Sequence, residues 1–253
     1  MKSIVIFGAG NVATHIFKAL GEIKGYKVIQ VYNHQKESLE FFRNVVPVTT
    51  DFTEVFPADI YLFALKDEAI PLLAEKIIYR DALMLHTSGA TPLSVFASFK
   101  QAGVFYPLQT FTKNKPVNFQ EIPICVEAKN KKQLEMIKQM AGKISPAVYE
   151  ISSVQRKSLH VAAVFVSNFV NFLYSQGEEI CRENKIPFEI LHPLIKETAL
   201  KIKDINPYDA QTGPAKRGDR KVINEHLALL NNDQKKIYNL LTQSIQQLHG
   251  KEL

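Results

Sequence analysis

Short apolar runs alternate with longer amphipathic segments through the first 150 residues of the chain. The apolar runs have the length and composition of buried strands, and they are Ser3–Phe7, Lys27–Tyr32, Ile60–Ala64, Leu83–His86 and Ile122–Val126. Helical periodicity predicts helices at Asn11–Leu20, Lys36–Phe42, Glu68–Ile78, Pro92–Lys100 and Lys129–Lys143, followed by a last strand near Ala147–Ile151. Strands that alternate with helices predict parallel crossovers and a doubly wound α/β sheet of the Rossmann type.

The pattern changes after Ser152, where only helices are expected. They are Ser153–Asn184, Phe188–Lys203, Lys221–Asn231 and Asp233–His249. We therefore predict a Rossmann domain over residues 1–152 and an all-α domain over residues 153–253. The most apolar stretch, Leu159–Tyr174, is shorter than a membrane span and contains Ser167, Asn168 and Asn171. We interpret it as a buried helix and expect no membrane partner.

Composition narrows the classes of protein further. The chain has 253 residues, 22% of them charged, and a net charge of +6 that is spread over both parts of the chain. No block of Lys and Arg resembles a nucleic-acid-binding tail, so the charge indicates a mild attraction for anionic ligands. The two cysteines form no CxxC pair, which argues against a disulfide framework or a thiolate metal site and fits a reducing cytoplasm.

The first strand runs directly into the sequence Gly8-Ala9-Gly10-Asn11-Val12-Ala13, which matches the pattern G-x-G-x-x-A. Gly8 would form the tight turn, Gly10 would let a pyrophosphate approach the backbone, and Ala13 would allow close packing of helix and sheet. The N–H groups and the dipole of the helix would favour the phosphate charge. This context predicts a dinucleotide site; the alternative is a simple turn.

The end of the second strand indicates which dinucleotide is bound. An NAD site usually has Asp or Glu here, but the chain has Asn33 and His34, followed by Lys36 and Ser38. These donors and the lysine cation suit a 2′-phosphate, so we predict NADP rather than NAD. The alternative is a solvated loop with a chance lysine.

Further polar residues follow the next strands, where open α/β sheets bind ligands. Ala64, Leu65 and Lys66 would line the nicotinamide ribose side, whereas Asp67 would line it or cap the next helix. The run His86-Thr87-Ser88-Gly89 brings an imidazole and two hydroxyls to the same edge. The hydroxyls could instead cap a turn, and His86 could be a core residue. Gln109 and Thr110 are polar in apolar surroundings, so they should satisfy backbone groups or face a ligand.

The helical domain contains two polar constellations. On the long helix, His160, Ser167 and Asn171 share one helical face and Asn168 lies at its edge, which fits a site or a network between helices. In the loop Thr212–Asp219, Arg217 could clamp a carboxylate, while Asp219 could cap the next helix or pair with Arg217.

These motifs together carry a family resemblance. The chain resembles bacterial proteins with a Rossmann-like domain followed by a DUF2520 domain. It is related more distantly to pyrroline-5-carboxylate reductase, prephenate dehydrogenase and the 6-phosphogluconate dehydrogenase-like group. The resemblance rests on the glycine turn, on segments 86–89, 106–111 and 212–219, and on His160-Val161-Ala162-Ala163 with Ser167-Asn168. It implies an oxidoreductase and a homodimer formed through the helical domain, with the face Phe165–Tyr174 as its seam.

We therefore expect a cytoplasmic NADP-dependent oxidoreductase that moves hydride between the nicotinamide and a C=O or C=N carbon. His160 is the first choice of general acid, because an imidazole titrates near working pH, and His86 is the second. Ser88 and Asn168 would hold the reacting oxygen or nitrogen, and Arg217 would hold an anionic group of a small substrate. Two alternatives are hydride exchange between NADP and a deazaflavin, and an NADP(H) sensor without turnover.

Overall fold

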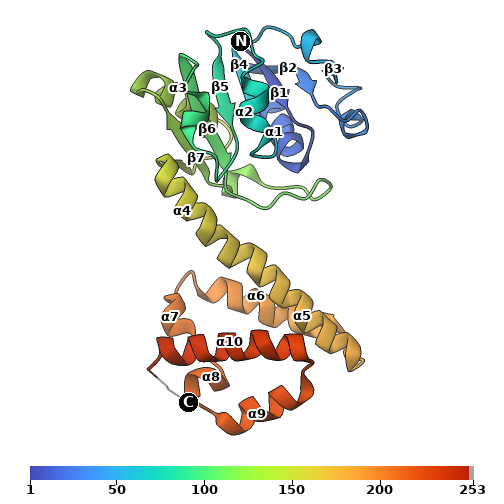
Figure 1. Ribbon diagram of the computed structural model, residues 1–253, viewed down its shortest axis with the longest axis vertical. Coiled ribbons are helices and arrows are strands. Elements are labelled where there is room, and N and C mark those ends of the chain that lie inside the picture. Colours follow the sequence, from blue (N-terminus) through green and yellow to red (C-terminus); the bar gives the residue numbers. More distant parts are fainter. Residues whose placement is uncertain (251–253) are drawn as a thin grey trace. The chain divides into compact units, whose positions relative to one another are not determined.

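Eight strands form one sheet in the N-terminal part of the chain. The computed structural model describes residues 1–250. The strands are β1 (Lys2–Phe7), β2 (Tyr26–Tyr32), β3 (Val48–Thr49), β4 (Ile60–Phe63), β5 (Leu83–His86), β6 (Gln101–Pro107), β7 (Ile124–Ala128) and β8 (Val148–Glu150). Their order across the sheet is β3-β2-β1-β4-β5-β6-β7-β8 (Figure 1). The order reverses between β1 and β4, which is the crevice at which doubly wound folds bind ligands.

Every neighbouring pair in the sheet is parallel except β6 and β7. The Rossmann fold expected from the alternating pattern is therefore confirmed, with one antiparallel step near the β8 edge. Mixed sheets with such a step are common among doubly wound folds. In the antiparallel pair, Tyr106 lies opposite Cys125.

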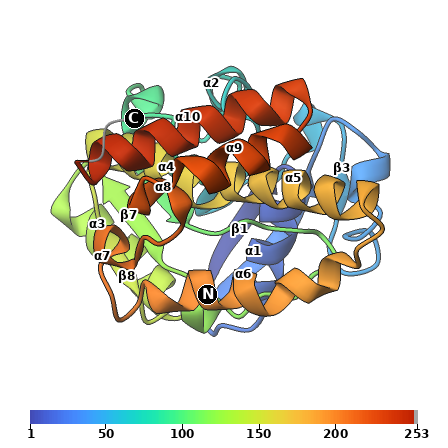
Figure 2. The ribbon, with the colours of Figure 1, turned by 90° about the horizontal axis from the view of Figure 1, so that it is seen from below.

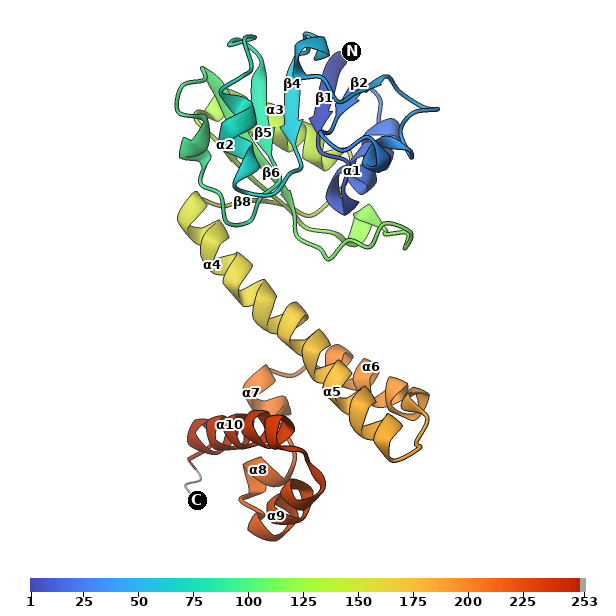
Figure 3. The ribbon, with the colours of Figure 1, turned by 45° about the vertical axis from the view of Figure 1, so that its right-hand side comes forward.

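Helices lie on both faces of the sheet (Figure 3). On one face, Ile4 and Ile6 pack with helices α1 (Asn11–Gly21) and α3 (Lys131–Gly142). On the other face, Phe7 and Phe63 stack with ring centroids 4.8 Å apart, and helix α2 (Ala69–Ala74) joins their cluster. Strands buried on both faces explain the continuous apolar runs in the sequence.

Two expected helices are only short 3-10 turns. The segment 36–42 contains a 3-10 helix at Glu37–Leu39, and the segment 92–100 contains one at Leu93–Phe96. Both segments are too short to overcome the cost of helix nucleation, so their buried side chains decide the local backbone. The strand β3, only two residues long, was not predicted at all.

The chain divides into two compact units, Met1–Ser167 and Asn168–Leu253, which are described separately below. The division falls inside the expected long helix, which begins directly after the predicted boundary at residue 152. That helix consists of α4 (Ser153–Ala163), a π-helical segment (Val164–Phe169) and α5 (Val170–Glu183). The π-helical segment has more residues per turn than the α-helices on either side of it, so the regular α-helical spacing is interrupted between His160 and Asn171. The shared face assigned to His160, Ser167 and Asn171 stays a prediction.

The second unit is entirely helical over its described residues, as expected. After α5 it contains α6 (His192–Lys201), the short α7 (Pro207–Ala210) and α8 (Pro214–Arg217), α9 (Arg220–Leu229) and α10 (Asn232–Leu248). Helices α9 and α10 lie side by side in Figures 1 and 2, and His226 Nδ1 lies 2.8 Å from the Tyr238 hydroxyl between them. Ala215 of α8 and Ile223 of α9 are buried in this unit.

The long helix is less buried than its apolar sequence suggested. Within the single chain only Arg156 and Cys181 are buried along Ser153–Glu183, whereas Val166 and Phe172 are exposed. The interpretation as a buried helix is therefore wrong for the isolated chain. By length and composition alone this helix could also cross a membrane, a test that core helices of soluble proteins pass as well.

Candidate functional site

The turn between β1 and α1 has the conformation that the glycine pattern predicts. Gly8 has a φ of +112°, and a Cβ on it would lie 2.2 Å from the carbonyl oxygen of Ala64. Its N–H donates to the Tyr32 oxygen at 2.8 Å, which ties this turn to the end of β2. Gly8 is therefore required by the backbone itself, because the turn passes so close to the end of β4.

Gly10 has a different role, because its surroundings are open. It is the N-cap residue of α1, no side chain caps this helix, and a Cβ on Gly10 would meet no atom within 4 Å. The first N–H groups of α1, including those of Asn11 and Val12, therefore have no side-chain cap. Ala13 is fully buried against the sheet. An uncapped helix start with room above it fits a pyrophosphate.

The side chain of Asn11 is already engaged. Its Nδ2 donates to the Phe111 carbonyl oxygen at 2.8 Å, and one turn later His15 Nε2 lies 2.9 Å from the Thr112 oxygen. These two bonds hold the segment after β6 against the first turns of α1. Asn11 can thus offer a phosphate its backbone N–H. Gln109 and Thr110, in the same segment, are exposed, so the expected apolar surroundings are absent.

The loop after β2 presents a cation and an imidazole. His34 and Lys36 are exposed, whereas Asn33 is buried and its Nδ2 donates to the Gln35 oxygen at 3.1 Å. The buried Asn33 shapes the loop, and His34 and Lys36 are the side chains free to reach a ligand. No acid occupies the end of β2.

The segments after β4 and β5 border the same edge of the sheet. Ala64 and Leu65 are partly buried and Lys66 is exposed. Asp67 does not cap α2, because the N-cap position is Glu68 and makes no side-chain bond there. Thr87 is partly buried, and its N–H donates to the Phe63 oxygen at 3.1 Å. Ser88 caps the turn that follows, since its Oγ accepts from the N–H groups of Ala90 and Thr91.

His86 is a core residue rather than a surface acid. It has no exposed surface, its Nδ1 accepts from the Ser88 N–H at 3.2 Å, and its Nε2 has no partner. Burial, and secondarily the charge of Arg156, lower the pKa of His86 to about 3. The ring is therefore neutral at working pH and holds no proton that it could easily release.

His160 lies in a different environment from His86. Its Nδ1 lies 3.3 Å from the Tyr106 hydroxyl, and both side chains are only partly buried. Gly89 backs the pair, because a Cβ on it would lie 2.8 Å from His160 Nδ1 and 2.9 Å from the Tyr106 ring. The unit 1–167 therefore brings the end of β5, the end of β6 and helix α4 together at one point.

An ion pair missed by the sequence analysis fixes the start of α4. Arg156 is 1% exposed, pairs with Glu127 of β7 and donates to the Thr91 oxygen at 2.6 Å. Ser153 Oγ also donates to Glu127 and accepts from the Leu93 N–H at 2.9 Å. His160 follows Arg156 by one helical turn, so these bonds position its ring over Gly89. The capping-box sequence Ser152–Gln155 was the available signal for this helix start.

Asn168 and Arg217 belong to the second unit. Both are exposed, and Arg217 lies in α8, between Gly213 and Gly218, both of which have positive φ. Asp219 caps α9, because its side chain accepts from the Val222 N–H at 3.2 Å. Of the two roles expected for Asp219, a helix cap or a partner of Arg217, the cap is confirmed. The structure thus groups the cofactor residues with His86, Ser88 and His160 in the first unit, and Asn168 and Arg217 in the second.

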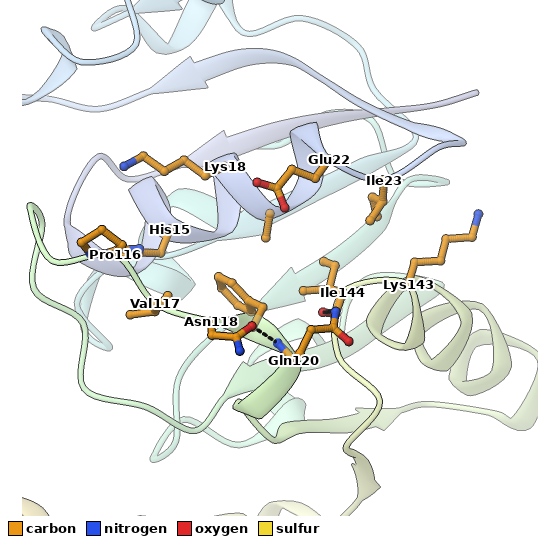
Figure 4. A pocket seen from close by; sticks show the side chains of 12 residues that line it. His15, Lys18, Glu22, Ile23, Pro116, Val117, Asn118, Gln120, Lys143 and Ile144 are labelled. Atoms are coloured by element: carbon orange, nitrogen blue, oxygen red, sulfur yellow. Dashed lines mark hydrogen bonds between the residues drawn. The ribbon is translucent and has the colours of Figure 1, made fainter.

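A separate pocket of about 470 Å³ lies beyond His15, on the side of α1 away from the glycine turn (Figure 4). Glu22 lies between Lys18 and Lys143 along its rim, and Asn118 and Gln120 close the opposite side. None of the predicted cofactor or proton-donor residues lines it. The candidate site is therefore the crevice at the carboxyl ends of the strands.

Comparison with known proteins shows which family and which solved structures the chain resembles. Residues 122–245 match the family described as "Domain of unknown function (DUF2520)". A Bacteroides fragilis protein named "putative NADP oxidoreductase" is 42% identical, with 99% of this chain and 98% of that one covered and a TM-score of 0.91. No curated protein matches the chain.

More distant structures share the fold. An imine reductase from Myxococcus stipitatus, in complex with NADP+, is 14% identical with a TM-score of 0.71, and 97% of this chain and 93% of that one are covered. The 1-pyrroline-5-carboxylate reductase of Streptococcus pyogenes is also 14% identical, with a TM-score of 0.67 and 98% of each chain covered.

Proposed function

Because this chain belongs to the DUF2520 family, we propose that it is an NADP-dependent oxidoreductase that reduces or forms a C=O or C=N bond. The observation that carries the proposal is the uncapped glycine turn at the reversal point of the sheet, followed by an acid-free end of β2. The named relatives support it, since they include a protein named "putative NADP oxidoreductase" and an imine reductase in complex with NADP+.

Different residues of the chain are proposed to bind different parts of the dinucleotide. The first N–H groups of α1 and the approach over Gly10 receive the pyrophosphate, while His34 and Lys36 receive the 2′-phosphate. Ala64, Leu65, Lys66 and Thr87 border the nicotinamide ribose. When bound, the cofactor supplies the hydride chemistry. The protein supplies position, charge and the accompanying proton.

We propose roles for four residues in proton transfer and substrate binding. His160 is placed to exchange a proton at the crevice, whereas the neutral, enclosed His86 is not. The Ser88 hydroxyl borders the reacting atom, and Asn168 and Arg217 are proposed to meet the substrate from the helical unit. An exposed guanidinium favours a substrate with a carboxylate or phosphate group.

Cofactor choice is tested by titrating the protein with NADPH and NADH and following the quenching or transfer of intrinsic fluorescence. We expect tighter binding of NADPH, and we expect Lys36→Gln to weaken NADPH binding about tenfold while leaving NADH unchanged. The exposed Lys132 on α3 provides the matched control as Lys132→Gln. Tighter binding of NADH, or equal losses in both lysine variants, would refute the assignment of the 2′-phosphate site.

A homodimer and a cytoplasmic location complete the proposal. Several apolar residues of the long helix are exposed, among them Val161, Val166 and Phe172, and a second copy would cover part of them. Sedimentation should show a dimer for the native chain and a monomer for Phe172→Glu. The variant Leu72→Glu, at an exposed site on α2, should remain dimeric. A monomeric native chain would contradict this part of the proposal.

A further inference from the structure

Tyr106 occupies the end of β6, beside the segment that follows β5. The strand is hydrogen-bonded on both sides, to β5 and to β7, so the tyrosine is held by a rigid element. Its hydroxyl lies 3.3 Å from His160 Nδ1. The ring packs against Gly89, where any side chain would collide with it.

This position is at the carboxyl edge of the sheet, where ligands of open α/β folds bind. The end of β5, with Thr87 and Ser88, is the immediate neighbour of the end of β6 in the sheet. The phenol therefore borders the region proposed for the nicotinamide. Tyr106 as a whole residue is partly buried rather than enclosed.

We propose that the Tyr106 hydroxyl is the group that gives the proton to the substrate, and that His160 is the positioning residue that replaces that proton. The inference rests on the proposed oxidoreductase function and goes beyond it by naming the proton donor. His160, the first choice from the sequence, becomes the second member of a pair.

The proton balance of the step is simple. As the substrate carbon gains the hydride, its oxygen or nitrogen takes the Tyr106 proton: the phenol O–H bond breaks and a new O–H or N–H bond forms. The imidazolium form of His160 then gives its Nδ1 proton to the phenolate, which leaves a neutral imidazole, and the ring takes up a new proton from solvent. In the direction of oxidation, the same pair accepts the proton in reverse order.

The groups around the phenol keep it protonated until it is needed. Burial raises the pKa of Tyr106, and Cys125 on β7 and Asp67 after β4 raise it further. Arg156 on α4 acts in the opposite direction and lowers it. His160, also on α4, completes the set. The phenol is neutral at rest. When it loses its proton, the cationic guanidinium of Arg156 can stabilise the transient phenolate.

The test measures the phenol directly and needs no substrate. Replacing Tyr106 with 3-fluorotyrosine lowers the pKa of the phenol and provides a 19F NMR signal for its titration. The spectrum is recorded without cofactor, with NADP+ and with NADPH. The oxidised nicotinamide carries a positive charge and the reduced one does not, so we expect a phenol pKa about one unit lower with NADP+. The exposed Tyr149, labelled in the same way, is the control and should not respond.

The outcomes separate the two proposals. If both cofactors bind but the Tyr106 titration is the same in both complexes, the proton-donor assignment is overturned while the cofactor proposal stands. If neither cofactor binds, the proposed function fails and this inference falls with it. In His160→Gln the fluorotyrosine pKa should change without cofactor; an unchanged value would remove His160 from the pair.

Turnover provides a second readout on any cyclic imine or keto acid that the enzyme reduces. We expect Tyr106→Phe to lower kcat by 100-fold or more with KM changed only a few-fold, and His160→Gln to lower it less. The opposite ranking, with His160→Gln the more damaging, would make His160 the direct donor and overturn the assignment.

Discussion

The two glycines of the β1–α1 turn should respond in opposite ways when each gains a methyl group. In Gly8→Ala the new Cβ would lie 2.2 Å from the Ala64 carbonyl oxygen, at a backbone φ of +112°. In Gly10→Ala the Cβ enters open space at a φ of −80°, which alanine adopts readily. We expect the first variant to lose stability and the second to lose cofactor affinity.

The expected loss in Gly8→Ala has two parts. Holding a non-glycine residue in a sparsely populated backbone conformation costs about 1–3 kcal/mol. Moving the turn away from the end of β4 to relieve the overlap adds about 1–3 kcal/mol, as overpacked cores do. The free energy of unfolding of the Rossmann unit should therefore fall by about 2–6 kcal/mol. For Gly10→Ala the weaker N-cap costs less than about 1 kcal/mol.

The assay combines urea unfolding, followed by circular dichroism, with NADPH titration of each variant. Gly10→Ala should unfold nearly as the native chain does, but it should bind NADPH at least about tenfold more weakly because its methyl group occupies the phosphate approach. A Gly8→Ala variant as stable as the native chain would refute the argument from backbone strain. Full NADPH affinity in Gly10→Ala would refute the placement of the pyrophosphate.

Two further predictions concern buried charge. Arg156→Met should lower the free energy of unfolding, measured by urea titration, by about 3–5 kcal/mol, because Glu127 loses its buried partner. Adding Glu127→Gln to this variant should restore part of the lost stability. The control Lys157→Met, at an exposed position of the same helix, should have little effect. Because the pKa of His86 is lowered to about 3, the unfolded chain binds a proton below about pH 6.5 that the native chain refuses. As the pH falls from about 6 to 3, His86 should therefore reduce the free energy of unfolding by up to about 1.4 kcal/mol per pH unit. Between pH 7 and 5 the native chain should lose more stability than His86→Gln. Equal losses in the two proteins would contradict this prediction.

The parts of the fold that sequence predicted well are those fixed by local pattern. The strand Leu83–His86 has its expected bounds, because an apolar run buried on both faces has few alternatives. The prediction of helices at 36–42 and 92–100 was wrong, because an amphipathic pattern of seven to nine residues does not form a stable helix without tertiary support. The two-residue β3 carries no periodicity to detect.

In the candidate site, too, the features that depend on local sequence could be predicted and those that depend on tertiary contacts could not. The glycine turn was predictable because its geometry depends on a few consecutive residues. The side chains near His160 were not, because they meet through pairing of β5, β6 and β7 and through the approach of α4. Arg156 looked like an ordinary surface residue of a helix, and only the position of Glu127 opposite it shows that it is buried. Asn33 looked like a ligand donor, and its bond to Gln35 shows that it shapes the loop.

The first turns of α4 link stability and chemistry in this protein. Arg156 and Ser153 tie the helix to β7 and to the segment after β5, and this places His160 one turn further along, against Gly89 and Tyr106. His160, Tyr106 and Gly89 pack so closely that a side chain on Gly89 would collide with the other two. This packing therefore depends on the position of the start of α4. A loss of the Arg156 anchor should therefore change the titration of Tyr106 even under conditions in which the unit remains folded. The anchor thus acts on the proposed proton donor through geometry as well as through its charge.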